Sequence, residues 1–172
     1  MSIYEHKRVR RITICGVLTA LAMIFSYIES LIPIPVPIPG IKLGIANIAI
    51  ITVLYIVGTW EAIAINLLRI TLTAILFGNM NTFLFSMAGG MLSILIMILL
   101  KRIGKFSMIG VSIAGGVSHN IGQIIAAVIL MDSSAIAYYL PVLFVAGIIT
   151  GVVIGIVGGM VTTRVLRASQ MN

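Results

Sequence analysis

The chain alternates between long apolar runs and short breaks of polar, charged, glycine and proline residues. Six runs approach the roughly 20 residues that a helix needs to cross a bilayer at about 1.5 Å per residue. They predict helices over 12–32, 41–57, 61–78, 82–100, 107–130 and 137–163. The second and third runs are short, and their shared boundary near Gly58 is weakly marked. The pattern predicts an all-α integral membrane protein, a bundle of six transmembrane helices in one membrane domain over 1–172.

The composition is that of a protein whose surface faces lipid. Hydrophobic residues make up 60% of the 172 residues and charged residues 9%, whereas soluble domains carry about 25% charged residues. The first run, 12–32, is too long for the core of a signal peptide, and no small-residue cleavage site follows it. We therefore expect an uncleaved first helix. Cys15 is the single cysteine, so no internal disulfide can form.

The basic residues stand in short clusters between the apolar runs, which is a pattern of membrane topology and not of a nucleic-acid-binding face. With both termini in the cytoplasm, nine basic residues lie inside: Lys7, Arg8, Arg10, Arg11, Lys101, Arg102, Lys105, Arg164 and Arg167. Outside, the loops carry one basic residue, Lys42. The positive-inside rule therefore predicts cytoplasmic termini, with 1–11 as a basic cytoplasmic segment. We expect no nucleic-acid partner.

The first external loop has a proline at every second position. Pro33, Pro35, Pro37 and Pro39 alternate with isoleucine and valine, and Gly40 ends the run. Each proline fixes φ near about −65° and favours extended geometry in the residue before it. The loop is predicted to be stiff, apolar and non-helical. It is either a rigid connector or a lid over a cavity that opens outward.

Polar side chains interrupt four of the predicted helices at a similar depth. Asn66, Arg69 and Thr73 share one face of the third because they lie three and seven residues apart. An arginine inside the membrane costs about 2.5–3.5 kcal/mol on insertion scales, so such groups need partners. In the predicted orientation they would line one electropositive cavity in the outer half of the membrane, suited to an anionic ligand. The candidate ligand-binding residues are Lys42, Asn47, Asn66, Arg69, Ser86, His119, Asn120 and Gln123.

These polar residues also have a structural interpretation. Arg69 can pair with Glu29 inside the bundle. The asparagine and glutamine side chains can join neighbouring helices, at about 0.6 kcal/mol per hydrogen bond. His119 is either a ligand contact or a structural hydrogen-bonding group. The convergence of the polar residues at one depth favours a ligand site over these alternatives.

Small residues recur at helical spacing in the first and last predicted helices. The last one contains a glycine every four residues: Gly147, Gly151, Gly155 and Gly159. Gly16 and Ala20 repeat this spacing in the first. Because lipid provides no hydrophobic force between helices, small residues allow the close backbone approach on which packing depends. The pattern predicts close packing within the bundle or a groove for a partner membrane protein.

The residues that catalysis and metal binding require are scarce. Asp132 is the only aspartate, and Glu5, Glu29 and Glu61 are the only glutamates. A magnesium-dependent diphosphate enzyme needs several carboxylates on facing elements. The sequence also contains no GxxxxGK[ST] nucleotide-binding loop and no histidine–cysteine cluster. We therefore predict a non-enzymatic protein with no catalytic residue, metal or cofactor.

Nearly the whole chain resembles one known family in four ordered segments. They are KLGIANI (42–48), LLRITLTAILFGN (67–79), FSMAGGMLSILIM (85–97) and GVSIAGGVSHNIGQ (110–123). The family is called Gx transporter, or heptaprenyl diphosphate synthase component I, and its members resemble the S components of energy-coupling-factor transporters. The resemblance implies an S-component-like bundle in a bacterial cytoplasmic membrane, in contact with membrane lipid.

The resemblance also implies a mechanism. S components capture a vitamin-like solute from outside, under a lid formed by the first external loop. They then topple in the membrane while bound to a transmembrane coupling protein with two cytoplasmic ATPases. Gly16 and Ala20 lie where the docking motif of the first helix would fall, although the usual form has alanine at both ends. The expected ligand is an anionic or amphipathic organic solute, such as a prenyl-type diphosphate, a quinone precursor or a flavin.

Two other classes of function stay open. The family label suggests a component of a prenyl diphosphate synthase, which would be non-catalytic because the chain lacks aspartate-rich motifs. A membrane subunit of a quinone- or flavin-linked redox system would form a stable complex with redox proteins and bind no solute tightly. The transport hypothesis instead predicts tight solute binding by the isolated protein, and ATP-dependent uptake only with the coupling module.

Overall fold

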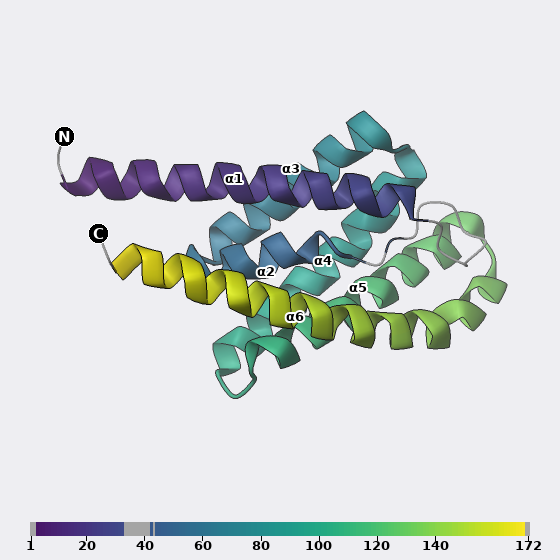
Figure 1. Cartoon of the computed structure of the whole chain (residues 1–172). Helices are drawn as coiled ribbons and strands as arrows, with labels where there is room; N and C mark the ends of the chain where they lie inside the picture. Colours follow the sequence, from purple (N-terminus) through teal and green to yellow (C-terminus); the bar gives the residue numbers. More distant parts are fainter. Residues whose placement is uncertain (1–2, 33–41, 43, 171–172) are drawn as a thin grey trace.

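The chain folds into a bundle of helices, and no strand occurs among the residues that the structure describes. A computed structural model describes residues 3–32, 42 and 44–170. The helices are α1 (Ile3–Leu31), α2 (Asn47–Ile56), α3 (Thr59–Phe77), α4 (Met80–Ile103), α5 (Met108–Met131) and α6 (Leu140–Gln170), with a short 3₁₀ helix, η1 (Ser134–Tyr139), before α6. The start of α1 and the end of α6 lie at the same end of the bundle (Figure 1).

Five segments are long and apolar enough to cross a membrane. They are Arg8–Leu31, Thr59–Phe77, Met80–Ile103, Met108–Met131 and Ser134–Arg167. The architecture confirms an all-α, multi-pass membrane bundle, and α3, α4 and α5 match their predicted bounds within three residues. The first and last helices are longer than predicted. The basic segment 1–11 is helical from Ile3, and α6 continues past 163 to Gln170. Both helices extend beyond their apolar runs, because polar residues can continue a helix outside the hydrocarbon core.

The second helix is shorter than predicted, since 41–57 becomes helical only at Asn47. Gly44 has a φ of +85°, in the left-handed region, which interrupts a helix that would begin earlier. At 10 residues, α2 is about 15 Å long, half of the roughly 30 Å hydrocarbon core. Its N-terminus lies inside the bundle, where Asn47 is buried. The proline-rich loop 33–40 lies outside the described residues.

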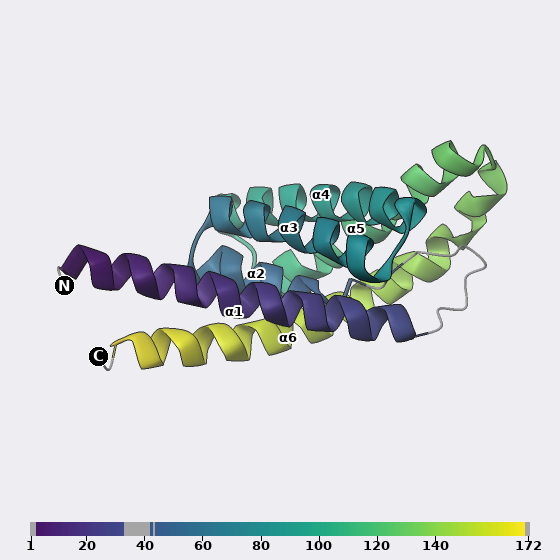
Figure 2. The ribbon, with the colours of Figure 1, turned by 90° about the horizontal axis from the view of Figure 1, so that it is seen from above.

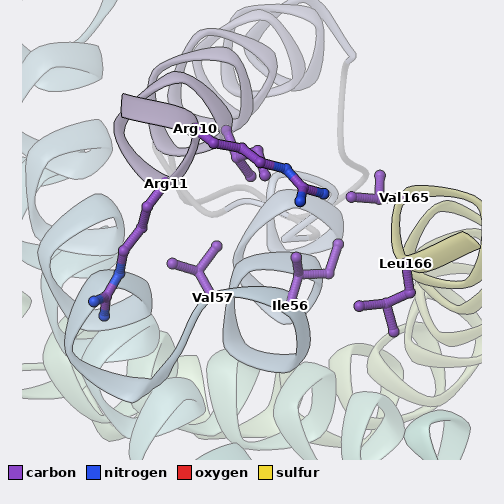
Figure 3. Close-up of a pocket in the computed structure, with 7 residues that line it drawn as sticks. Arg10, Arg11, Ile56, Val57, Val165 and Leu166 are labelled. Carbon is purple, nitrogen blue, oxygen red and sulfur yellow. The ribbon is translucent and has the colours of Figure 1, made fainter. Parts of the chain in front are cut away.

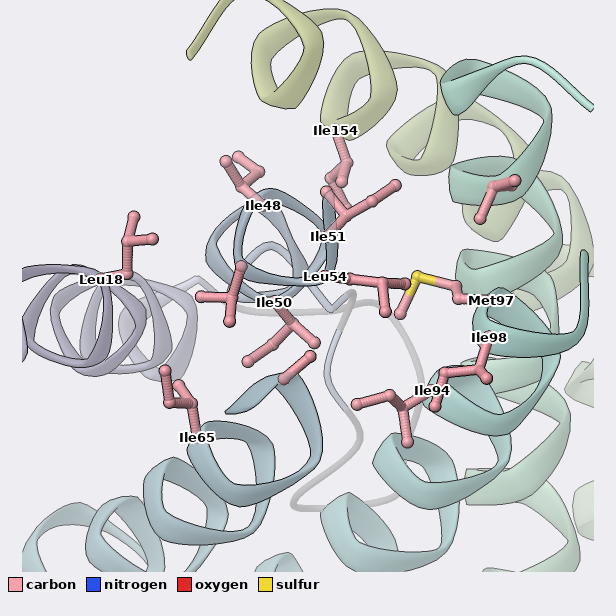
Figure 4. Close-up of a cluster of buried hydrophobic side chains, with 13 residues drawn as sticks. Leu18, Ile48, Ile50, Ile51, Leu54, Ile65, Ile94, Met97, Ile98 and Ile154 are labelled. Atoms are coloured by element: carbon pink, nitrogen blue, oxygen red, sulfur yellow. The ribbon is translucent and has the colours of Figure 1, made fainter. Parts of the chain in front are cut away.

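The apolar core is built around α2. This helix lies between α1 and α6 on one side and α3 and α4 on the other (Figure 2). Eight of its 10 residues are buried. The residues labelled around it in Figure 4 are Leu18 of α1, Ile65 of α3, Ile94, Met97 and Ile98 of α4, and Ile154 of α6. Because α2 is surrounded on all sides, its sequence has no polar stripe.

The last two long helices pack backbone to backbone. A Cβ built on Gly151 would lie 2.5 Å from Ile113 Cα, and one on Gly155 would lie 2.7 Å from Ile109 Cα. On the α5 side, a Cβ on Gly116 would lie 2.5 Å from the Gly147 carbonyl oxygen. Three glycines of the predicted ladder therefore serve packing within the bundle. Gly159, the fourth, would have no atom within 4 Å of its Cβ.

The turns on either side of α4 are set by capping residues. Asn79 Oδ1 accepts a hydrogen bond from Thr82 N (2.9 Å) at the start of α4. Gly104, with a φ of +73°, ends α4, and Ser107 Oγ accepts from Gly110 N (3.1 Å) at the start of α5. These are the residue types that favour such positions. They fix the short loops that hold α3, α4 and α5 antiparallel.

Candidate ligand-binding site

A polar cluster surrounds Arg69 in the interior of the bundle, where α2 begins. Its members come from α1, the segment before α2, α2 itself, α3 and α5. They are Ser26, Glu29, Lys42, Asn47, Asn66, Arg69, His119 and Gln123, each at most 8% exposed. We call this group the Arg69 cluster. Arg69 lies ten residues into α3, about 15 Å along its axis, which is near the middle of this 19-residue helix.

Arg69 joins three helices through its guanidinium group. Its Nη2 donates to Asn66 Oδ1 (2.9 Å) and to Asn47 Oδ1 (3.3 Å). A longer contact runs from Nη1 to Ser26 Oγ on α1 (3.4 Å). Asn66 is held in turn, because its Nδ2 donates to the Gly90 carbonyl of α4 (3.1 Å). The arginine is thus positioned by side chains from α1, α2 and α3.

Glu29 occupies the N-terminal side of α2. Its Oε1 accepts hydrogen bonds from Gly44 N and from Ile45 N, the latter at 3.2 Å. No ion pair joins Glu29 to Arg69, although Arg69 and Lys42 both interact with it electrostatically. The carboxylate therefore satisfies free backbone amides and complements the positive end of the α2 dipole. The direct pairing considered from the sequence is not formed.

The remaining members connect the segment before α2 to α5. Lys42 N donates to Gln123 Oε1 (3.3 Å), and Gln123 Nε2 lies 3.1 Å from His119 Nε2. Gly44 lies between Asn47, which bonds to Arg69, and His119, which contacts Gln123. A Cβ on Gly44 would be 3.1 Å from Asn47 Nδ2 and 3.4 Å from His119 Cδ2. Because Gly44 has no side chain, Asn47 and His119 can approach it from both sides, which brings the residues around Arg69 close to those around His119.

Several buried polar atoms in and beside the cluster have no hydrogen-bond partner among the described residues. In the cluster they are Glu29 Oε2, Asn47 Nδ2 and Arg69 Nε, and outside it Thr73, Ser86, Ser93, Ser112, Asn120 and Thr162 also have an unpaired side-chain atom. More than about 90% of buried polar groups in proteins are satisfied, and leaving one unpaired costs about 1–3 kcal/mol. The three in the cluster are two donors and one acceptor next to buried charged groups, a combination that is suited to binding a further polar molecule.

Six of the eight predicted ligand residues belong to this cluster: Lys42, Asn47, Asn66, Arg69, His119 and Gln123. Ser86 is buried on α4, one turn before Gly89, and a Cβ on Gly89 would lie 2.8 Å from Gln123 Cγ. Asn120 lies apart, because its Nδ2 donates to the Leu143 carbonyl oxygen of α6 (2.6 Å). Neighbouring residues on α5 thus face different helices, with His119 toward α4 and Asn120 toward α6.

Two members of the cluster, Ser26 and Glu29, do not follow from the sequence as ligand-site residues. The sequence pattern does not mark Ser26, and it indicates Glu29 only as a direct partner of Arg69. The available signal was their spacing, since Ser26 and Glu29 share a face of α1 among apolar neighbours. Their role depends on the segment before α2, whose path the sequence pattern did not reveal.

One family matches the chain over most of its length. The family model described as Heptaprenyl diphosphate synthase component I matches residues 18–161. The chain belongs to this family. The matched range contains every residue of the Arg69 cluster. The cluster therefore lies within the region that the family model describes. Comparison with curated proteins and with solved structures gave no match.

In this family member, Asn120 is expected to act as a structural link between α5 and α6. Replacing it with alanine removes the hydrogen bond to Leu143 and should lower the stability of the bundle by about 0.6–1.7 kcal/mol. Thermal unfolding in detergent measures this loss. Ile125→Ala is a suitable control, because Ile125 is 50% exposed on the same helix. Unchanged stability in Asn120→Ala would return this side chain to the group of candidate ligand contacts.

Proposed function

We propose that this protein is the solute-binding membrane subunit of an uptake transporter, comparable to the S components of energy-coupling-factor transporters. The Arg69 cluster carries the proposal, because it combines buried charges with unpaired hydrogen-bonding atoms near the middle of the membrane. Ionisable residues at this depth are expensive and usually mark the path or binding site of a solute. A purely structural cluster would be expected to satisfy its own atoms.

The cluster favours a ligand with an anionic group. Arg69 and Lys42 contribute two positive charges to the cluster, against the single negative charge of Glu29. Arg69 Nε and Asn47 Nδ2 are donors without a partner, whereas Glu29 Oε2 is an acceptor that a hydroxyl or ring N–H of the ligand would satisfy. An anionic flavin, an acidic quinone precursor and a prenyl-type diphosphate all supply the anion or the acceptor oxygens that this site needs.

In this proposal the ligand reaches the site from outside the cell. Lys42, Gly44 and Glu29 lie toward the end of the bundle opposite the start of α1 and the end of α6, and the positive-inside rule assigns that end to the exterior. The cluster is almost completely buried, so in this proposal part of the bundle has to move for the ligand to bind and leave. The role of loop 33–40 as a lid stays a prediction, as do the cytoplasmic location of the termini and the bacterial membrane.

The coupling protein would dock on α1. Gly16 and Ala20 are both exposed, and a Cβ on Gly16 would meet no atom within 4 Å. Gly16 also lines an open groove of about 610 Å³ between α1 and α3. These small residues are therefore not used for packing within the described bundle. This supports the proposed contact with a transmembrane coupling protein that carries two cytoplasmic ATPases.

The family description favours a second candidate, a membrane component of heptaprenyl diphosphate synthase. With one aspartate and three glutamates in the whole chain, such a component would act without its own magnesium site. This candidate predicts a stable complex with a soluble synthase subunit and a change in product chain length. The transport proposal predicts ATP-dependent uptake that requires the coupling module.

Native mass spectrometry of the purified protein tests the transport proposal. We expect a retained small molecule, or a thermal shift with at least one member of a panel of flavin mononucleotide, prenyl diphosphates and acidic quinone precursors. Protein purified after mild denaturation and refolding provides the ligand-free control. If no small molecule is retained and no panel member shifts the unfolding temperature, the solute-binding proposal is wrong.

A further inference from the structure

An open cleft lies between α1 and α6 at the end of the bundle where α1 begins and α6 ends, and it shares no lining residue with the Arg69 cluster. Its volume is about 410 Å³, within the range of about 300–1,000 Å³ found for small-molecule sites. It is lined by Arg10, Arg11 and Ile14 of α1, by Ile56 and Val57 at the end of α2, and by Val165 and Leu166 of α6 (Figure 3). We call it the α1–α6 cleft.

The cleft follows from the short length of α2. This helix packs against both α1 and α6, while α1 and α6 make no substantial contact with each other. Helix α2 ends at Ile56, whereas α1 starts as far out as Ile3 and α6 continues to Gln170. Beyond the end of α2, the two long helices therefore face each other without a described element between them.

The two arginines of the cleft differ in their partners. Arg11 forms a salt bridge with Glu61 of α3. Arg10 has no hydrogen bond or ion pair with any described residue, and it extends across Ile56 toward Val165 (Figure 3). An unpaired guanidinium group thus lies over an apolar floor built by α2 and α6. A guanidinium group binds phosphate oxygens in bidentate geometry.

We propose that the α1–α6 cleft binds an anionic phospholipid. The phosphate would contact Arg10, and the first part of an acyl chain would lie against Ile56, Val57, Val165 and Leu166. The position fits this occupant, because Arg10 stands where α1 passes from its charged start into the apolar run that begins at Ile12. Basic pockets between transmembrane helices at a membrane surface are suited to anionic headgroups. A lipid held here would bridge α1 and α6 where the protein itself does not.

The test compares phosphatidylglycerol with phosphatidylcholine on the whole protein. Purified protein is given an equal mixture of the two lipids in detergent, and native mass spectrometry counts the lipids retained. We expect wild-type protein to retain phosphatidylglycerol in preference to phosphatidylcholine and to gain thermal stability from it. In Arg10→Gln, retention of phosphatidylglycerol should fall at least fivefold. Arg102→Gln removes an exposed arginine outside the cleft and should behave as wild type.

Val165→Trp tests the acyl-chain position without changing the charge, since it fills the apolar floor. It should also reduce retention, and both variants should unfold at the wild-type temperature in phosphatidylcholine alone. Equal retention of phosphatidylglycerol by wild-type and Arg10→Gln protein would overturn the proposal. So would full competition by soluble glycerol phosphate, which would assign the cleft to free anions. Neither result depends on whether the Arg69 cluster binds a solute.

Discussion

Replacing Gly151 with alanine is expected to destabilise the bundle by about 1–3 kcal/mol, the usual range for overpacking. The new Cβ would lie 2.5 Å from Ile113 Cα and 3.0 Å from Ile113 N. These are backbone atoms of α5, which cannot rotate away as a side chain can. Helices α5 and α6 would have to separate along the whole contact. Equilibrium unfolding of the purified protein in detergent measures the change.

Gly159→Ala is the matched control for this substitution. It lies on the same helix and in the same four-residue repeat, but its Cβ would meet no atom within 4 Å. Alanine is a better helix former than glycine by about 1 kcal/mol. We therefore expect Gly151→Ala to lower the stability of the bundle. Gly159→Ala should raise its stability slightly or leave it unchanged. Equal effects at the two positions would show that the α5–α6 contact does not depend on close backbone approach.

Replacing Arg69 with alanine is expected to weaken ligand binding by roughly 10- to 100-fold, since a hydrogen bond to a charged group contributes about 1.5–3 kcal/mol. The substitution also leaves Asn47 Oδ1 and Asn66 Oδ1 without their donor. A loss of stability should therefore accompany the loss of binding. Titration with any panel compound that shifts the unfolding temperature of the wild-type protein gives the affinity.

Arg69→Lys separates the two effects. Lysine keeps the positive charge near Glu29 but lacks the planar group that reaches two acceptors at once. We expect it to recover part of the stability and little of the affinity. Arg102→Ala, at the exposed end of α4, controls for the loss of an arginine elsewhere. If Arg69→Ala lost stability but bound the ligand as tightly as wild type, Arg69 would be structural and its contact with the ligand excluded.

The amphipathic and apolar patterns of the sequence were sufficient to predict the long helices that can each cross a membrane. Helices α3, α4 and α5 agreed with their predicted bounds within three residues, because capping residues mark their limits, such as Asn79 at the start of α4 and Gly104 at its end. The pattern did not predict the start of α2. Residues 44–46 are as apolar as the helix that follows, and it is the conformation of Gly44, held by Glu29, that delays the helix to Asn47.

The candidate site was predicted in its composition but not in its connections. The depth of Asn66, Arg69 and His119 followed from their positions along apolar runs, and the structure brings all three into one cluster. Asn120 has the same depth as His119 but contacts α6. Adjacent residues on a helix point about 100° apart, so depth alone does not decide which neighbour a side chain meets.

The sequence by itself determined that this is a membrane bundle, where its long helices lie and at which level its polar residues gather. The bilayer selects for these features one segment at a time, through length and hydropathy. Only the tertiary structure decided that α2 has just 10 residues, that Glu29 accepts hydrogen bonds from the segment before it and that Arg69 bonds to Asn47 and Asn66. Those contacts depend on how each helix is rotated against its neighbours, and that rotation is fixed by packing between segments far apart in the chain.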